Sequence, residues 1–353
     1  MRHGIRPDSG RKTWAQSTLA LPRIHQLSKG AGVKMVVVDA GVALQAPALP
    51  GRVSAAGAAG SDGVGHGTFA AGLLAAVRTQ GSDGVGMAAQ ARVTAFKSTD
   101  DRSAPSPQQA AGGIREAADR RADVIYVGYA LRTGAAELTQ AATCAARGGA
   151  RVVAPVAPDA VPPGEPGPEA QRPTGPYWPA AAPGVLSVVD FAPSGPGQKD
   201  APPAHALHLS APGGAMVGIG PRGWGHYIGS GASLTAGCTA GAAALVRAHH
   251  PHGTAKEVSW HLLEAAYPAD TPRLDRYAAM TMTLPHGTAA RAAAPPAHMP
   301  ALAEPAPGVR AWAVAGGSLA LVLPAAAAAV IPRGRARVRP PPGRPPDAAA
   351  PGQ

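Results

Sequence analysis

Short apolar runs rich in valine alternate along the chain with longer stretches rich in alanine. A short apolar run that ends at a polar residue, glycine or proline is typical of a buried strand followed by a turn, and a longer run of good helix formers is typical of a helix. The predicted strands cover residues 34–38, 93–96, 123–127, 151–154, 185–189 and 208–210. The predicted helices cover residues 67–76, 107–121, 135–147, 234–249 and 255–266. This alternation predicts an α/β fold in which helices cover both faces of a mostly parallel sheet.

The C-terminal part of the chain has a different pattern. Residues 285–310 are rich in alanine and proline and are expected to form a linker. Residues 311–331 carry no charged side chain. A helix of about 21 residues at 1.5 Å each spans roughly 31 Å, which matches the core of a bilayer. We therefore expect a transmembrane helix over residues 311–331, with an alanine-rich helix packed on the domain as the alternative.

The charges beside this segment predict its orientation. Five arginines follow it in a basic tail, residues 332–353, whereas only Arg310 lies close before it. The positive-inside rule places such a tail in the cytoplasm and the large domain outside the cell membrane, as a single-pass protein. Residues 1–31 are polar, are expected to be irregular, and contain no apolar run that resembles the core of a secretory signal. We expect that the start codon has been assigned too far downstream, with an unusual export route as the alternative.

Composition narrows the possible functions only in part. The 353 residues can bury one large core or two modest ones, and the net charge is +11. Binding to nucleic acid would need a clustered basic face, often with aromatic residues between the charges, but the arginines are spread along the chain and only 4% of residues are aromatic. No nucleic-acid partner is therefore expected. Cys144 and Cys238 could form one disulfide or remain two free thiols, and neither belongs to a cluster with the spacing of metal ligands.

Three short segments supply the side chains of one hydrolytic site. Asp39 ends the first predicted strand, His66 precedes the first predicted helix, and Ser233 precedes a later helix. A carboxylate, an imidazole and a hydroxyl that meet in space activate a serine nucleophile, and Asp, His, Ser is one of the known chain orders of this triad. The tripeptide His-Gly-Thr also occurs at His252 and His286, where a solvated loop is the better interpretation.

The segments around these residues resemble the motifs of subtilisin-like serine proteases, and within that family those of the membrane-anchored mycosins linked to type VII secretion. They are Val-Val-Val-Asp-Ala-Gly-Val at 36–42, Asp-Gly-Val-Gly-His-Gly-Thr at 62–68 and Gly-Ser-Gly-Ala-Ser at 229–233. The resemblance implies a three-layer subtilisin-like peptidase domain over residues 25–284, after an N-terminal extension of residues 1–24. It also implies a peptide substrate, no metal or organic cofactor, and the type VII secretion membrane complex as a partner.

The resemblance assigns the nucleophile to Ser233 and the general base to His66, with Asp39 as the carboxylate that faces the imidazole. The chain contains no asparagine, although the family normally uses an asparagine side chain in its oxyanion hole. Pro158 occupies that place and has neither a side-chain donor nor an N–H, and Pro155 removes a further backbone donor beside the substrate cleft. Two hypotheses follow: a serine endopeptidase of reduced activity or, alternatively, a catalytically impaired pseudoprotease that acts as a structural or binding component of a membrane secretion complex.

Overall fold

The computed structural model describes residues 14–49, 51–79, 85–100, 104–159, 176–192, 195–196, 208–220 and 226–283. Its centre is an eight-stranded sheet with the order β2-β3-β1-β4-β5-β6-β7, in which β8 pairs with β6. The described pairs in this sheet are parallel except for β6 with β7. Its strands are β1 (Lys34–Asp39), β2 (Val53–Ala55), β3 (Arg92–Lys97), β4 (Val124–Val127), β5 (Arg151–Pro155), β6 (Leu186–Ala192), β7 (Gly195–Pro196) and β8 (Leu209–Pro212). A second, antiparallel sheet pairs β9 (Met216–Ile219) with β10 (His226–Gly229).

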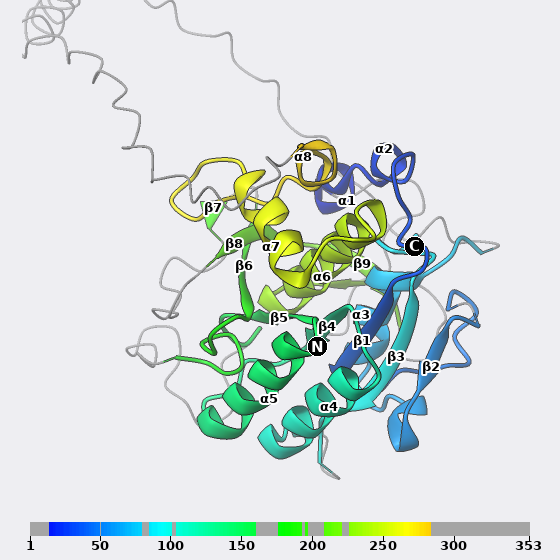
Figure 1. Cartoon of the computed structure of the whole chain (residues 1–353). Helices are drawn as coiled ribbons and strands as arrows, with labels where there is room; N and C mark the ends of the chain where they lie inside the picture. Colours follow the sequence, from blue (N-terminus) through cyan, green and yellow to red (C-terminus); the bar gives the residue numbers. More distant parts are fainter. Residues whose placement is uncertain are drawn as a thin grey trace, which may run out of the picture. The chain divides into compact units, whose positions relative to one another are not determined.

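Helices cover both faces of the main sheet (Figure 1). One face carries α4 (Pro107–Asp119) and α5 (Ala135–Arg147), which pack side by side. The other face carries α3 (His66–Ala75) and α6 (Ala232–His249), which also contact each other. The shorter helices are α1 (Trp14–Leu19), α2 (Leu21–Ile24), the 3-10 helix η1 (Gly57–Gly60), α7 (Ala255–Glu264) and α8 (Arg276–Thr281).

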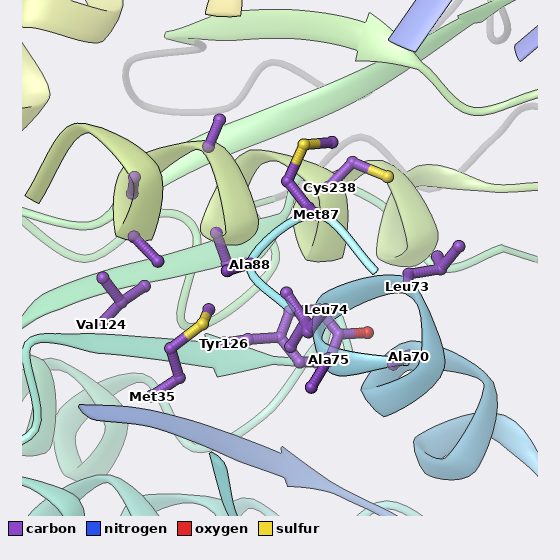
Figure 2. Packing of buried hydrophobic residues seen from close by; sticks show 14 of the residues in the cluster. Met35, Ala70, Leu73, Leu74, Ala75, Met87, Ala88, Val124, Tyr126 and Cys238 are labelled. Carbon is purple, nitrogen blue, oxygen red and sulfur yellow. The ribbon is translucent and has the colours of Figure 1, made fainter. Parts of the chain in front are cut away.

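Strand β1 lies inside the sheet and is buried from both sides. Val36 and Val38 belong to the core cluster formed with α4 and α5, whereas Met35 and Val37 belong to the cluster formed with α3 and α6. Figure 2 shows Met35 and Tyr126 in this second cluster, close to residues of α3. A strand that is buried on both faces needs apolar side chains at successive positions, which explains the continuous valine run in the sequence.

The structure confirms the predicted subtilisin-like α/β fold with a mostly parallel sheet, and an observed element overlaps every predicted strand and helix. The expectation that the first 31 residues are irregular is wrong for residues 14–24. They form α1 and α2, because Leu19 and Ile24 are buried against the core. Cys144 is exposed and Cys238 is buried, and both are free thiols.

The predicted C-terminal segments lie outside the described residues. These are the linker at 285–310, the transmembrane helix at 311–331 and the basic tail at 332–353. Within the described ranges, no helix combines the length and the apolar character that a membrane crossing needs. The linker, the transmembrane helix and the tail therefore stay predictions.

Thr254 and Glu257 form a capping box at the start of α7. The Thr254 side chain accepts a hydrogen bond from the Glu257 N–H at 3.2 Å, and the Glu257 side chain accepts one from the Thr254 N–H at 2.6 Å. Both N–H groups would otherwise lack a partner at the helix start. We expect Thr254→Ala to lower the free energy of unfolding by about 1 kcal/mol, measured by urea denaturation. Thr254→Ser keeps a hydroxyl at this position and should retain most of the stability of the wild type. Equal denaturation midpoints for the wild type, Thr254→Ala and Thr254→Ser would contradict the role of the cap.

Candidate active site

The carboxyl end of β1 and the N-termini of α3 and α6 meet at one edge of the sheet. Asp39 is the last residue of β1, His66 is the first residue of α3, and Ser233 is the second residue of α6. This edge is where functional groups gather in α/β proteins, because strands end there and helix N-termini present free N–H groups. The fold therefore brings together three side chains that are far apart in the sequence, with 167 positions between His66 and Ser233.

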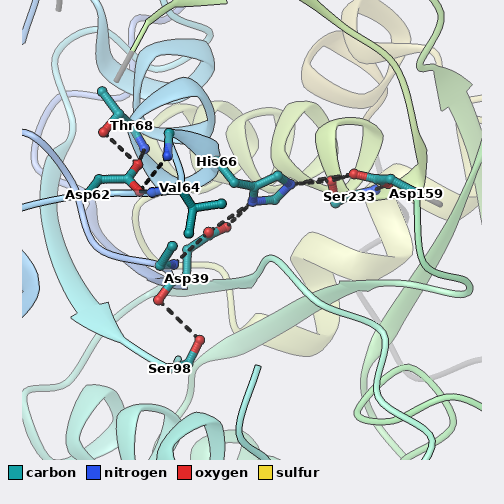
Figure 3. Close-up of polar contacts among 10 residues, drawn as sticks. Asp39, Asp62, Val64, His66, Thr68, Ser98, Asp159 and Ser233 are labelled. Carbon is teal, nitrogen blue, oxygen red and sulfur yellow. Dashed lines mark hydrogen bonds and ion pairs between the residues drawn. The ribbon is translucent and has the colours of Figure 1, made fainter. Parts of the chain in front are cut away.

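Hydrogen bonds join these three side chains into a relay (Figure 3). His66 Nδ1 lies 2.9 Å from both carboxylate oxygens of Asp39, and His66 Nε2 lies 2.8 Å from Ser233 Oγ. Asp39 is fully buried, and its Oδ1 also accepts a hydrogen bond from the Ala40 N–H at 2.7 Å. One nitrogen of the imidazole thus faces a buried carboxylate while the other faces the serine hydroxyl.

Two glycines let backbone segments pack tightly around Asp39. A Cβ atom on Gly128 would overlap the Asp39 carboxylate, and a Cβ atom on Gly67 would overlap the carbonyl oxygen of Gly41. Gly41 itself has φ 104°, a backbone conformation that side chains disfavour. These close approaches place the start of α3 directly against the end of β1, which sets the distance between the imidazole and the carboxylate.

Asp62 fixes the turn that leads into α3. Its side chain accepts hydrogen bonds from the N–H groups of Val64, Gly65 and Thr68 and from the Thr68 hydroxyl, at 2.7 to 3.1 Å. Thr68 in turn accepts one from the Ala43 N–H at 2.9 Å. Asp62 therefore positions His66 from one side. Asp62 is part of the sequence motif at 62–68, but its positioning role could be seen only in the structure.

A fourth side chain, Asp159, reaches the relay from the segment after β5. Asp159 Oδ1 accepts the Ser233 N–H at 2.8 Å, and Asp159 Oδ2 accepts a short hydrogen bond from Ser233 Oγ. The same Oδ2 lies 3.5 Å from His66 Nε2. The resemblance assigns this place to the adjacent Pro158, whereas in the structure Asp159 is the residue that contacts Ser233. The available signal was an acidic residue one position beyond the place where the family carries its oxyanion side chain.

The model of the subtilase family, peptidase S8, matches residues 30–281. This chain belongs to the subtilase family. Mycosin-3 of Mycobacterium tuberculosis is 30% identical to this subtilase over 94% of its chain and 86% of the mycosin. Thermitase of Thermoactinomyces vulgaris is also 30% identical, over 40% of this chain and 53% of thermitase.

Solved structures of mycosins share the fold of this subtilase. MycP3, a protease from the type VII (ESX-3) secretion system, superposes with a TM-score of 0.66 at 26% identity, over 80% of this chain and 92% of MycP3. MycP1 with its N-terminal propeptide removed gives a TM-score of 0.67 at 24% identity, over 79% of this chain and 99% of MycP1. A chain in the periplasmic assembly of the ESX-5 inner membrane complex gives 0.67 at 22% identity, over 86% of this chain and 92% of that chain.

The charges around His66 of this subtilase favour the protonated imidazole. Burial by itself lowers the pKa of His66, but the charge of Asp39 and the hydrogen bonds with Asp159 and Asp39 outweigh burial and raise the pKa to about 10. In this arrangement His66 is an imidazolium near neutral pH, and an imidazolium donates from both nitrogens and accepts no proton.

Two phenols lie beside the relay and remain neutral. Tyr129 stacks on His66 with 5.4 Å between ring centroids, and burial followed by the charge of Asp39 raises the pKa of Tyr129 well above its ordinary value. Burial and the charges of Asp39 and Asp159 do the same to the pKa of Tyr126. The negative charge at the site therefore comes from carboxylates. Among the described residues, no cluster of three or more histidine, cysteine or acidic side chains could hold a metal ion.

Proposed function

We propose that this subtilase is a serine endopeptidase that uses Asp39, His66 and Ser233 as its catalytic triad. The observation that carries the proposal is the relay of hydrogen bonds from the buried Asp39 carboxylate through His66 to Ser233 Oγ. Such a relay has one principal use in protein chemistry, which is to make a serine hydroxyl nucleophilic. No metal or organic cofactor is part of the proposal.

The proposed reaction proceeds through an acyl-enzyme. Ser233 Oγ attacks the carbonyl carbon of the peptide bond while neutral His66 takes its proton at Nε2 and then delivers it to the leaving amine. Water hydrolyses the ester on Ser233 by the same proton transfers in reverse order. The N–H of Ser233, at the N-terminus of α6, would donate a hydrogen bond to the negative oxygen of the tetrahedral intermediate.

We further propose that the peptidase works at a membrane as part of a type VII secretion complex. The similarity to Mycosin-3 extends over 94% of the chain, beyond the peptidase domain. MycP3 is a protease from the type VII (ESX-3) secretion system, and a further chain of the same fold belongs to the periplasmic assembly of the ESX-5 inner membrane complex. The uncharged segment 311–331 would anchor the chain after the linker at 285–310, with the peptidase domain (25–284) outside the membrane and the basic tail inside.

A second candidate function is that of a catalytically impaired component of the same complex. The position of Asp159 favours it, because a carboxylate rather than a hydrogen-bond donor lies beside Ser233 N and Oγ. A subtilase that cannot stabilise an oxyanion would keep its fold and its binding surfaces but would lose most of its turnover.

The two functions are separated by labelling the full chain with a fluorophosphonate, which phosphonylates only an activated serine. We expect slow but measurable labelling of the wild type and none of Ser233→Ala. Ser54→Ala removes an exposed hydroxyl from the edge strand β2 and should label like the wild type. If Ser233→Ala and the wild type incorporate equal amounts of probe, or if the folded wild type stays unlabelled at every pH, the chain is not an active serine hydrolase in this form.

A further inference from the structure

We propose that the Asp159 carboxylate is a built-in block of this active site: it occupies the position needed by the oxyanion and holds the nucleophile in an unreactive state. This inference rests on the proposed function and names what controls it. It comes from one feature of the structure, namely that both oxygens of a single carboxylate bind the nucleophilic residue.

The donor that the reaction needs is already used. The N–H of Ser233 donates to Asp159 Oδ1 at 2.8 Å, and this N–H is the backbone donor beside the nucleophile. A carboxylate only accepts hydrogen bonds, so it cannot replace the asparagine-type donor of an oxyanion hole. A negative oxygen formed on the substrate would compete for the same N–H and would meet a negative charge at that place. Asp159 must therefore move away or lose its charge before the intermediate can form.

The proton of the nucleophile points away from the base. Ser233 Oγ donates its hydrogen bond to Asp159 Oδ2, while His66 Nε2 lies 2.8 Å from the same Oγ. When His66 is protonated, Nε2–H donates to Oγ, and the serine hydroxyl has only Asp159 as acceptor. The hydrogen bond then runs from the imidazolium to the serine. Catalysis requires the opposite, a serine hydroxyl that donates to a neutral imidazole.

Asp159 also adds to the negative charge that keeps His66 protonated. Asp39 lies on one side of the imidazole at 2.9 Å and Asp159 on the other at 3.5 Å, so that two carboxylates enclose one cation. The other titratable groups that face this pair are Asp62 before α3, Tyr126 in β4, Tyr129 after β4 and Asp190 in β6. Of these described groups only His66 can carry a positive charge, so nothing else offsets Asp159.

The local chain is shaped to admit this carboxylate. Gly231, two positions before Ser233, has φ 144°, and a Cβ atom there would overlap the Asp159 side chain. One quarter of the Asp159 side-chain surface remains exposed. The carboxylate is therefore partly open to solvent, so an arriving substrate carbonyl could displace it.

The block predicts a gain of activity on substitution. We expect Asp159→Asn to raise the second-order rate constant for fluorophosphonate labelling at pH 7 by about 10²–10³-fold, because the amide supplies a donor to the oxyanion and removes the charge. Asp159→Ala removes the block without adding a donor and should show a smaller gain. Asp119→Asn removes an equal charge from the exposed end of α4 and should leave the rate unchanged.

The pH dependence gives a second readout. His66 acts as a base only when it is neutral, so the labelling rate of the wild type should rise with pH up to about 10. Asp159→Asn removes one of the two charges that favour the imidazolium, so its profile should move to lower pH. The titration of His66, followed by NMR of histidine-labelled full-length chain, should move in the same direction. The His66 resonance is assigned by its absence from His66→Ala.

These measurements separate failure of the block from failure of the proposed function. If the wild type labels at Ser233 and Asp159→Asn labels no faster, the block is overturned and the peptidase function stands. If neither folded protein labels, the peptidase function fails, and the NMR titration decides the rest. A lower His66 pKa in Asp159→Asn than in the wild type then supports the proposal that Asp159 keeps His66 protonated. An unchanged His66 pKa overturns that proposal.

Discussion

His66→Ala is expected to lower the rate constant for labelling Ser233 by about four to six orders of magnitude when both proteins carry Asp159→Asn. Among the described residues, the imidazole of His66 is the base that lies within hydrogen-bond distance of Ser233 Oγ in that background, at 2.8 Å. The unblocked background matters, because a wild type whose nucleophile is already held by Asp159 starts from a low rate and would hide most of the loss. The measurement is labelling over a range of probe concentrations, with folding checked by circular dichroism.

A matched control for this substitution is available in the chain. His252 stands in a second His-Gly-Thr tripeptide, in the exposed turn after α6, so His252→Ala removes the same side chain from the same local sequence. It should label as fast as its parent. A loss of less than about tenfold in His66→Ala would mean that the relay is not what activates Ser233, and a similar loss in His252→Ala would point to a general effect on the fold.

The parts of this site that could be predicted from the sequence are those fixed by local pattern. The buried strand before Asp39 needs apolar residues on both faces, and His66 and Ser233 each lie in the first turn of a helix within a glycine-rich segment. Residue type and secondary structure therefore point to the same assignment. The fold class follows from the same alternation of strands and helices. For these elements, the secondary structure that the local sequence favours is the one that the fold contains.

Asp159 could not be predicted in this way, because its role depends on where the chain turns after β5. A shift of one residue in that turn decides whether Pro158 or Asp159 points at Ser233, and no period in the sequence determines it. The short strands β2, β7, β9 and β10 were missed for a related reason, since two to four residues are too few to show a pattern. Helices α1 and α2 are too short to show a periodic pattern, although Leu19 and Ile24 could be read as possible anchors, and they form because these two side chains are buried against the core.

The retained relay and the intruding carboxylate fit one physical description. Gly67 and Gly128 allow the close packing around Asp39 that the relay requires, and Gly231 leaves the space that the Asp159 side chain occupies. An unpaired buried carboxylate at Asp39 would be costly, so its pairing with His66 stabilises the resting site. Asp159 thus stabilises the same arrangement that it makes unreactive.

Gly67→Ala is expected to lower the free energy of unfolding by about 3 kcal/mol, because the added methyl group would overlap the carbonyl oxygen of Gly41. Gly41 cannot yield, since its own left-handed backbone lies against the carbonyl oxygen of Ser61. The strain must therefore push α3 away from the end of β1. This movement would separate His66 from Asp39, so the labelling rate should fall together with the stability.

Gly112→Ala is the matched control for this loss, because Gly112 also lies within a helix, α4. Apart from its chain neighbours and the backbone of its own helix, no atom lies within 4 Å of the place that a Cβ atom would take. At such a position alanine should stabilise the protein by about 0.5–1 kcal/mol, through its better helix propensity. Urea denaturation of the two variants should therefore move the midpoint in opposite directions with similar slopes. If the midpoint of Gly67→Ala rises as that of Gly112→Ala does, the contact between α3 and β1 tolerates a side chain. The distance between His66 and Asp39 would then be set by something other than this glycine.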